Sequence, residues 1–262
     1  MSYEEGRMFM ISRKRPLILV SNDDGVHAEG LVTLTRSLKK MGRVVVVAPD
    51  QQRSAASHSI TLHRPLRINQ IGKDIYAIDG TPTDCIVLAV REILNAAPDL
   101  IVSGINHGPN LGDDVHYSGT VSAAFEGGML GIPSIAISLV SNGKRDFKPA
   151  ANFAVKIARK VLHEGLPPGV ILNINVPNVN SHNIKGYLFT FQGKRRYRGV
   201  IEEKLDPRGK KYYWIGGSPK ANYEDIKGSD CSAIMHGRIS ITPLRVDLTD
   251  RTVLEWIKDW KL

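Results

Sequence analysis

Cysteine is scarce in this 262-residue chain, which contains only Cys85 and Cys231. The two do not form a CxxC pair and cannot build a disulfide framework, so the sequence favours a reducing compartment. No cluster of histidine and cysteine stands at the spacing that zinc sites use. These absences argue against a disulfide-rich secreted domain and a zinc module, and we expect a cytoplasmic protein.

Long apolar runs are also missing, since no stretch approaches the length of a membrane-spanning helix. The N-terminal segment, residues 1–15, is mixed and charged. Its apolar part, residues 8–11, is too short for the core of a signal peptide. We therefore expect no membrane association and a disordered leader over residues 1–15.

Several familiar signatures of nucleotide-binding proteins and hydrolases do not occur. Residues 25–30 do not spell GxGxxG, and the Walker A pattern is absent. No GxSxG nucleophile elbow is present either. The sequence thus argues against a dinucleotide-binding fold, a P-loop NTPase and a serine hydrolase.

The chain does carry an excess of positive charge, with a formal net charge of +9, and 42% hydrophobic residues. The apolar content suffices for a real core. The positive charge favours an anionic partner, either a phosphorylated small molecule or a nucleic acid. Because no run of basic residues interleaved with aromatics dominates the chain, nucleic acid is the second choice.

One stretch organises the rest: a bulky apolar run over residues 17–20, followed by Asn22, Asp23, Asp24 and Gly25. Such a run is typical of a strand buried on both faces. Ligands of open α/β sheets lie beyond the carboxyl ends of the strands. Two adjacent carboxylates there repel each other unless a cation lies between them, and their oxygens suit Mg²⁺ or Mn²⁺. The alternative is a polar turn that caps the next helix.

Strand and helix patterns then alternate. Buried strands are expected at residues 17–20, 44–47, 99–103, 134–138 and 170–176, and helices at 29–41, 84–95, 121–130 and 149–162. Short strands are expected at residues 60–62, 66–68 and 75–78. The repeat predicts a doubly wound, mostly parallel α/β sheet over residues 16–180, whose first two strands are parallel.

Two further loops follow strand ends on the same edge. Residues 50–59 carry Arg53 and Ser54, and residues 104–120 carry Asn106. Ser118, Gly119 and Thr120 end the second loop at the start of a helix, where free N–H groups attract phosphate. The alternatives are a plain surface loop and ordinary helix capping. Three such loops on one edge favour metal-assisted chemistry on an anion.

The composition changes after residue 177. We expect a C-terminal extension over residues 181–262, with a long hairpin, a last strand at 238–242 and a closing helix at 248–260. Its far arm carries Tyr212, Tyr213 and Trp214. Exposed edges and aromatics of this kind are usually covered by another subunit.

Several motifs together resemble those of the SurE (survival protein) family of 5′/3′-nucleotidases. They are residues 18–25 (ILVSNDDG), 46–50 (VVAPD) with 53–54 (RS), 79–85 (DGTPTDC), 100–110 (LIVSGINHGPN), 117–124 (YSGTVSAA) and 172–177 (LNINVP). The resemblance spans nearly all of residues 17–243, whereas the leader has no counterpart in the family pattern.

The resemblance implies a Rossmann-like phosphatase that releases phosphate from nucleoside 5′- and 3′-monophosphates, and from short polyphosphate, with one divalent ion. The family's four metal ligands fall on Asp23, Asp24, Ser54 and Asn106. The family also forms dimers that exchange C-terminal segments and often pair into tetramers, which agrees with the expected hairpin.

For the chemistry, we expect Asp23 and Asp24 to be catalytic as well as metal-binding, with Asp23 orienting or deprotonating a water. Asn22 and the Ser118–Gly119–Thr120 turn are expected to hold the phosphate oxygens.

Two other function classes stay open at this point. One is a regulator that binds nucleotide or polyphosphate without turnover. The other is an RNA-binding protein that uses Arg195, Arg196 and Arg198.

Overall fold

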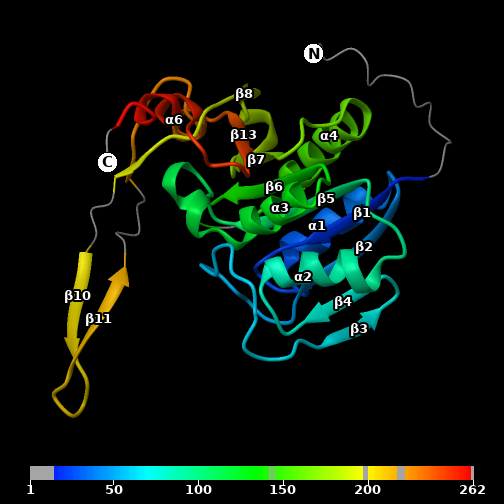
Figure 1. Cartoon of the computed structure of the whole chain (residues 1–262), viewed down its shortest axis with the longest axis horizontal. Coiled ribbons are helices and arrows are strands. Elements are labelled where there is room, and N and C mark those ends of the chain that lie inside the picture. The colour runs from blue at the N-terminus through cyan, green and yellow to red at the C-terminus, as the bar shows by residue number, and fades with distance from the viewer. Residues whose placement is uncertain (1–14, 142, 144, 197–199, 217–221, 261–262) are drawn as a thin grey trace.

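The computed structural model describes residues 15–141, 143, 145–196, 200–216 and 222–260, so nearly all of the expected leader lies outside the described residues. A nine-stranded sheet forms the centre of the molecule, in the order β3-β4-β2-β1-β5-β6-β7-β13-β8 (Figure 1). Its strands are β1 (Leu17–Ser21), β2 (Arg43–Pro49), β3 (Ile68–Gly72), β4 (Ile75–Ile78), β5 (Leu100–His107), β6 (Ser134–Val140), β7 (Val170–Pro177), β8 (Tyr187–Phe189) and β13 (Ile239–Arg245).

Strands β4, β2, β1, β5, β6 and β7 run parallel to one another, as the βα repeat predicts. Only β3 and β13 pair antiparallel with their inner neighbours. The predicted parallel pairing of the first two strands is confirmed, with Ile18 opposite Val44. All parallel strands therefore end at one edge of the sheet, where the polar loops follow.

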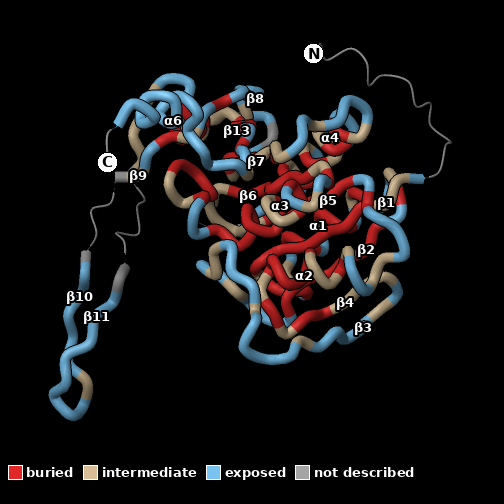
Figure 2. The backbone as a smooth tube through the Cα atoms, in the orientation of Figure 1, coloured by how far each residue is buried: buried red, intermediate tan, exposed pale blue. Residues whose placement is uncertain are grey.

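Helices cover both faces of the sheet. On one face, α1 (Glu29–Leu38) and α4 (Lys148–Glu164) pack against each other and share one apolar core with the sheet. On the other face lie α2 (Pro82–Leu88) and α3 (Gly119–Met129), whose core side chains include Cys85. The buried residues run through the parallel strands between these layers (Figure 2). The doubly wound architecture is thus confirmed.

Three local predictions were wrong. The short strand expected at residues 66–68 begins only at Ile68 and runs to Gly72 as β3. Residues 60–62 form no strand, because the backbone N–H and hydroxyl of Thr61 bond to the Asp84 carboxylate instead of a neighbouring strand. The helix expected over residues 84–95 ends as an α-helix at Leu88 and continues as a π-helical turn over Ala89–Ile93.

The C-terminal part divides between the sheet and the surface. Strands β8 and β13 join the main sheet, while β10 (Val200–Leu205) and β11 (Lys211–Gly216) form an antiparallel hairpin that projects from the body (Figure 1). Strands β9 (Arg195–Arg196) and β12 (Asn222–Tyr223) pair separately, α5 (Asp230–Met235) precedes β13, and α6 (Arg251–Ile257) closes the chain. Among the described residues, no helix has the length and apolar character to cross a membrane.

Candidate functional site

The turn after β1 is tightly closed. Asn22 and Asp23 are buried, and Asn22 Nδ2 donates to the carbonyl oxygen of Gly25 at 3.0 Å. Gly25 has a φ of +99°, a conformation that side chains rarely allow, which explains the glycine after the two aspartates. The turn therefore presents Asp23 and Asp24 in a fixed place at the carboxyl edge.

Asp23 lies against the N-terminus of α3. The Thr120 hydroxyl donates to Asp23 Oδ1, although 97 residues separate them in sequence. A Cβ on Gly119 would come within 2.8 Å of Asp23 Cβ, so only glycine permits this approach. Ser118 Oγ caps the helix by accepting the Val121 N–H at 3.1 Å. The predicted loop and helix start thus meet the first aspartate directly.

Burial shapes the electrostatics of this carboxylate. Loss of hydration raises the pKa of Asp23 to about 6, and the neighbouring Asp24 charge adds to the increase. The Thr120 hydrogen bond opposes the rise in pKa by stabilising the charged form. In the absence of a bound cation, burial and the Asp24 charge therefore outweigh the groups that stabilise the charged form of Asp23.

Asp24 faces the end of β5. Its Oδ2 accepts the backbone N–H of His107 at 3.3 Å, and His107 Nδ1 lies 2.8 Å from Oδ1, an ion-pair distance when the ring is protonated. The pairing of β5 with β6 shifts register between Ser103 and Asn106. Asn106, half-buried, donates from Nδ2 to Gly108 O at 3.0 Å. The register shift places Asn106 and His107 beside the aspartate turn.

Ser54 reaches the site from the loop after β2. The Arg53 N–H donates to the carbonyl oxygen of Asp23 at 2.7 Å, which brings the neighbouring Ser54 to the same edge. Ser54 itself is exposed, and its Oγ accepts from Gln52 Nε2 at 2.7 Å. All four predicted metal ligands therefore stand on adjoining segments of one sheet edge.

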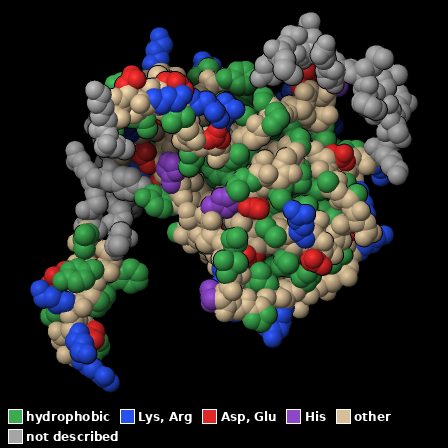
Figure 3. Space-filling view, viewed as in Figure 1, with side chains coloured by type: hydrophobic (Ala, Val, Ile, Leu, Met, Phe, Trp, Pro, Cys, Tyr) green, Lys and Arg blue, Asp and Glu red, His purple; other side chains and the backbone are tan. Residues whose placement is uncertain are grey.

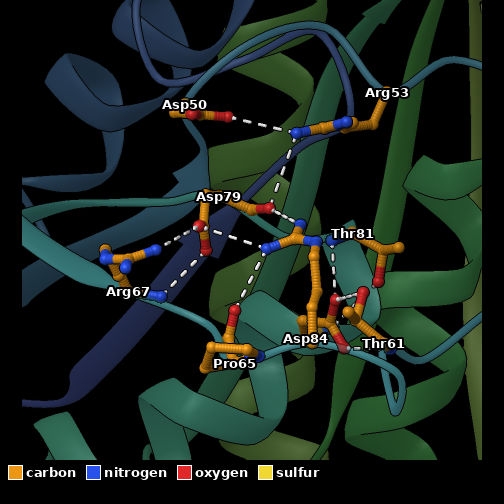
Figure 4. A network of polar contacts seen from close by, with 9 residues as sticks. Asp50, Arg53, Thr61, Pro65, Arg67, Asp79, Thr81 and Asp84 are labelled. Carbon is orange, nitrogen blue, oxygen red and sulfur yellow. Dashed lines mark hydrogen bonds and ion pairs between the residues drawn. The ribbon is translucent and has the colours of Figure 1, made fainter.

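A polar network holds the rest of that loop (Figure 4). Asp79 accepts the Arg67 N–H at 2.8 Å and pairs with Arg64 at 3.1 Å. Asp84 accepts from the Thr61 N–H at 2.9 Å, the Thr61 hydroxyl at 2.7 Å and the Thr81 N–H at 2.8 Å. Bonds to Asp79 and to Asp84 thus hold the segment between β2 and β3 on the C-terminal side of Ser54.

Other polar residues of the predicted loops serve the fold. Asn110 is buried, with its amide N–H bonded to Asn175 Oδ1 at 2.8 Å and its side chain bonded to Ser138 at 2.8 Å. Arg195 forms an ion pair with Asp114 and donates its N–H to Asp113 at 3.0 Å. Arg198, from the same basic cluster, lies outside the described residues.

The sequence reasoning missed His107 and Asp84. His107 directly follows the metal-ligand candidate Asn106, and this position next to a candidate ligand could have marked it as a site residue. Asp84 forms a capping box with Thr81. A threonine followed three residues later by an acidic residue, before an apolar helix, is the sequence signal for this motif.

The donor set fits a hard divalent cation. It consists of two carboxylates, a hydroxyl and an amide, all oxygen ligands of the kind Mg²⁺ and Mn²⁺ prefer. Across the described ranges, no group of three or more His, Cys, Asp and Glu side chains stands where it could hold a metal ion, so the candidate set relies on Ser54 and Asn106 beside the two carboxylates. The buried Asn22 Oδ1 has no hydrogen-bond donor within the part of the chain that is described, so an unused acceptor oxygen lies behind the carboxylates.

Comparisons with known proteins give a consistent result. The sequence profile of the family described as survival protein SurE matches residues 18–199. The 5′-nucleotidase SurE of Geobacter sulfurreducens is 52% identical over 246 residues, 94% of each chain. That of Geotalea daltonii is 50% identical over 246 residues, 94% of this chain and 99% of the relative. The crystal structure of the SurE protein from Aquifex aeolicus matches with a TM-score of 0.84 and 46% identity, covering 93% of this chain and 98% of that one.

Proposed function

The chain belongs to the survival protein SurE family, and from this membership we propose that it is a divalent-metal-dependent 5′-nucleotidase. It hydrolyses nucleoside 5′-monophosphates to nucleoside and phosphate. The observation that carries the proposal is the contact of the Asp23–Asp24 turn with the N-terminus of α3. That contact supports the proposal because it brings the turn that would bind the cation beside the helix start that would bind phosphate.

Asp23, Asp24, Ser54 and Asn106 would hold the cation. A divalent ion there supplies Lewis-acid charge to the phosphoryl oxygens as the transition state develops. Thr120 fixes Asp23 through Oδ1, which leaves Oδ2 to act on a water or the ion. His107 holds Asp24 through its backbone N–H and ring.

The first turn of α3 would bind the phosphate. The N–H groups of Gly119 and Thr120 have no acceptor within the helix, and both residues are buried. Anions bind such N-termini because the N–H groups and the helix dipole both favour negative charge. The side chain of Asn22, at the same edge of the sheet, would be a further contact to the phosphate. The Thr120 hydroxyl hydrogen already serves Asp23, so its backbone is the stronger phosphate contact.

Phosphate release from a panel of nucleoside 5′-monophosphates tests the proposal. We expect turnover with Mg²⁺ or Mn²⁺, loss of turnover in EDTA, and recovery when the ion is restored. Full activity after exhaustive chelation would exclude the metal role. Tight nucleotide binding without any phosphate release would point to a regulator instead.

We extend the proposed substrates to 3′-monophosphates and short polyphosphate, because the candidate site contacts phosphate through backbone groups that read no sugar position. The same panel with 3′-monophosphates and tripolyphosphate tests this. No release from either substrate, under conditions where 5′-monophosphates react, would restrict the enzyme to the 5′ class.

We also propose that the chain self-associates as a dimer or tetramer through the C-terminal extension. The hairpin exposes Tyr212, Tyr213 and Trp214, and the described part of α6 buries no residue. Light scattering at low micromolar concentration tests this, with a chain lacking residues 200–216 as the comparison. A stable, active wild-type monomer would refute it.

The scarcity of cysteine supports a cytoplasmic location for this enzyme. Fractionation of the source cells with an antibody to the chain tests that location, and recovery in a membrane or extracellular fraction would contradict it.

A further inference from the structure

A cavity of about 460 Å³ lies beside the candidate site and has no role in the metal and phosphate contacts. One wall is the face of α3 that carries Ser122, Phe125 and Met129. The opposite wall is the chain after β8 and the connection from β13 to α6. On the face of the molecule that Figure 3 shows, histidine side chains lie beside hydrophobic ones.

The residues that line the cavity are not those of the candidate site, but two of them lie on the segments that carry site residues. His58 lines the cavity and follows Ser54 in the same loop. Ser57 Oγ donates to the carbonyl oxygen of His116 at 2.6 Å. This bond connects the loop that carries Ser54 to His116, which also lines the cavity. On α3, Ser122 stands three residues after Gly119, which is about 4.5 Å along the helix axis. Ser122, a lining residue, is therefore less than one helical turn along α3 from Gly119, which contacts Asp23.

The lining suits a flat, neutral ring. The His58 and Phe125 rings are nearly parallel, with an interplanar angle of 26° and centroids 6.4 Å apart. Phe191 and Met129 add exposed apolar surface, and Gln192 contributes an amide. Heteroaromatic bases stack on such surfaces whatever their hydrogen-bonding pattern.

Charge at the same place argues against a second phosphate. His58 Nε2 lies 3.0 Å from the Glu126 carboxylate, so the one histidine that stacks on Phe125 is already paired with an acid. Arg245 and Asp247 also line the cavity, so an additional phosphate would meet acidic groups as well as a cation.

We propose that this cavity receives the base of the nucleotide, with Phe125 as the stacking residue, while the phosphate lies at the N-terminus of α3. The inference rests on the proposed function, since it assigns the part of the same substrate that the metal and phosphate groups do not reach. It makes Phe125 a specificity-determining residue for nucleotides over other phosphate esters.

Phe125→Leu tests the assignment, because leucine keeps apolar volume and removes the ring. We expect the KM for AMP and GMP to rise about fivefold to tenfold, with kcat and the KM for ribose 5-phosphate nearly unchanged. Phe189→Leu is the matched control, because Phe189 is 74% exposed and does not line the cavity. An equal change for AMP and ribose 5-phosphate, or equal KM values for both in the wild type, would overturn the base assignment and leave phosphatase activity intact.

A second measurement does not depend on turnover. Adenosine, which has no phosphate, is titrated into the full chain in EDTA and followed by the chemical shifts of a ring-labelled phenylalanine sample. We expect shifts in the Phe125 signal that Phe125→Leu removes and Phe189→Leu leaves. Saturating adenosine without any shift at Phe125 would overturn the proposal even if phosphate release is metal-dependent, and a shift without phosphate release would contradict the proposed function alone.

Discussion

Asp23 and Ser54 are expected to hold the same cation, yet the two regions that present them are built differently. Asp23 is buried, bonded to Thr120, and packed against Gly119 so closely that no side chain fits there. Ser54 is exposed, and its Oγ accepts a hydrogen bond from the side chain of its neighbour Gln52. Side-chain packing and hydrogen bonding thus fix Asp23, the buried half of this comparison. Ser54, the exposed half, is positioned by the backbone of its loop.

The difference has an energetic reason. A buried carboxylate raises the free energy of the folded state unless a partner stabilises its charge, so the surrounding structure must enforce its position. An exposed hydroxyl costs nothing in this respect and needs no such support. We expect substitutions at the buried Asp23 and at its partner Thr120 to alter activity and stability together, and substitutions at the exposed Ser54 to alter ion affinity alone.

The largest effect is expected from Asp24→Asn. Removing this charge should lower kcat by about two orders of magnitude or more, because the ion is lost or misplaced. The stability of the metal-free protein should change little, since relief of repulsion from Asp23 offsets the lost pairing with His107. Melting temperatures with and without Mn²⁺ check this: the ion should stabilise the wild type and stabilise the variant far less. Equal shifts with intact turnover would remove Asp24 from the ligand set.

The pH dependence of the metal-free protein is the next test. Because the pKa of Asp23 is raised from 3.8 to about 6, the folded state binds a proton between these values that the unfolded state does not. The stability contributed by Asp23 is therefore fully present below pH 4 and is lost as the pH rises through 6. Relative to Asp23→Asn, the wild type should lose about 3 kcal/mol between pH 3 and 7.

Urea unfolding in EDTA at several pH values measures this difference. The same pH slope for both proteins would show that Asp23 has an ordinary pKa and that burial does not control it.

Thr120→Val should have a smaller effect. It removes the donor to a charged oxygen at nearly constant volume, with an expected cost of roughly 1.5–3 kcal/mol. Since the Thr120 bond lowers the pKa of Asp23, its loss should move the acid limb of the activity profile to higher pH. Thr120→Ser keeps the donor and is the control. A pH profile that is identical in all three proteins would separate Thr120 from Asp23 function.

Ser54→Ala should have the smallest effect. We expect stability to stay within about 0.5 kcal/mol of the wild type, as for other exposed positions. The Mn²⁺ concentration for half-maximal activity should rise by less than about tenfold, since a neutral oxygen contributes less than a carboxylate. Titration of activity with Mn²⁺ measures this. A loss of folding stability would show that the exposed half is as tightly built as the buried half.

The gathering of the candidate site residues at one edge of the sheet was predictable because it depends on local signals. Apolar runs that end in Asn22, Asp23 and Asp24, and a Ser-Gly-Thr sequence before a helix, mark strand ends and a helix start. The parallel sheet then brings those ends to one edge, which the strand order confirms.

The contacts inside the site were not predictable in the same way. The Thr120 hydroxyl bonds to a residue 97 positions away, and this depends on how closely α3 approaches the sheet. His107 reaches Asp24 because the pairing of β5 with β6 changes register between Ser103 and Asn106. No residue pattern in the sequence predicted that change. The cavity beside Phe125 exists because residues 243–248 return across α3.

The late entry of β13 into the sheet has a consequence for biosynthesis. This strand pairs antiparallel with β7, but the chain passes through residues 178–238 before β13 begins. While a ribosome is still making that stretch, the outer edge of β7 has no partner from β13. An unpaired edge of this kind invites pairing with other nascent chains. Chains that terminate before residue 239 are therefore expected to aggregate, even though every residue of the candidate site has already been made.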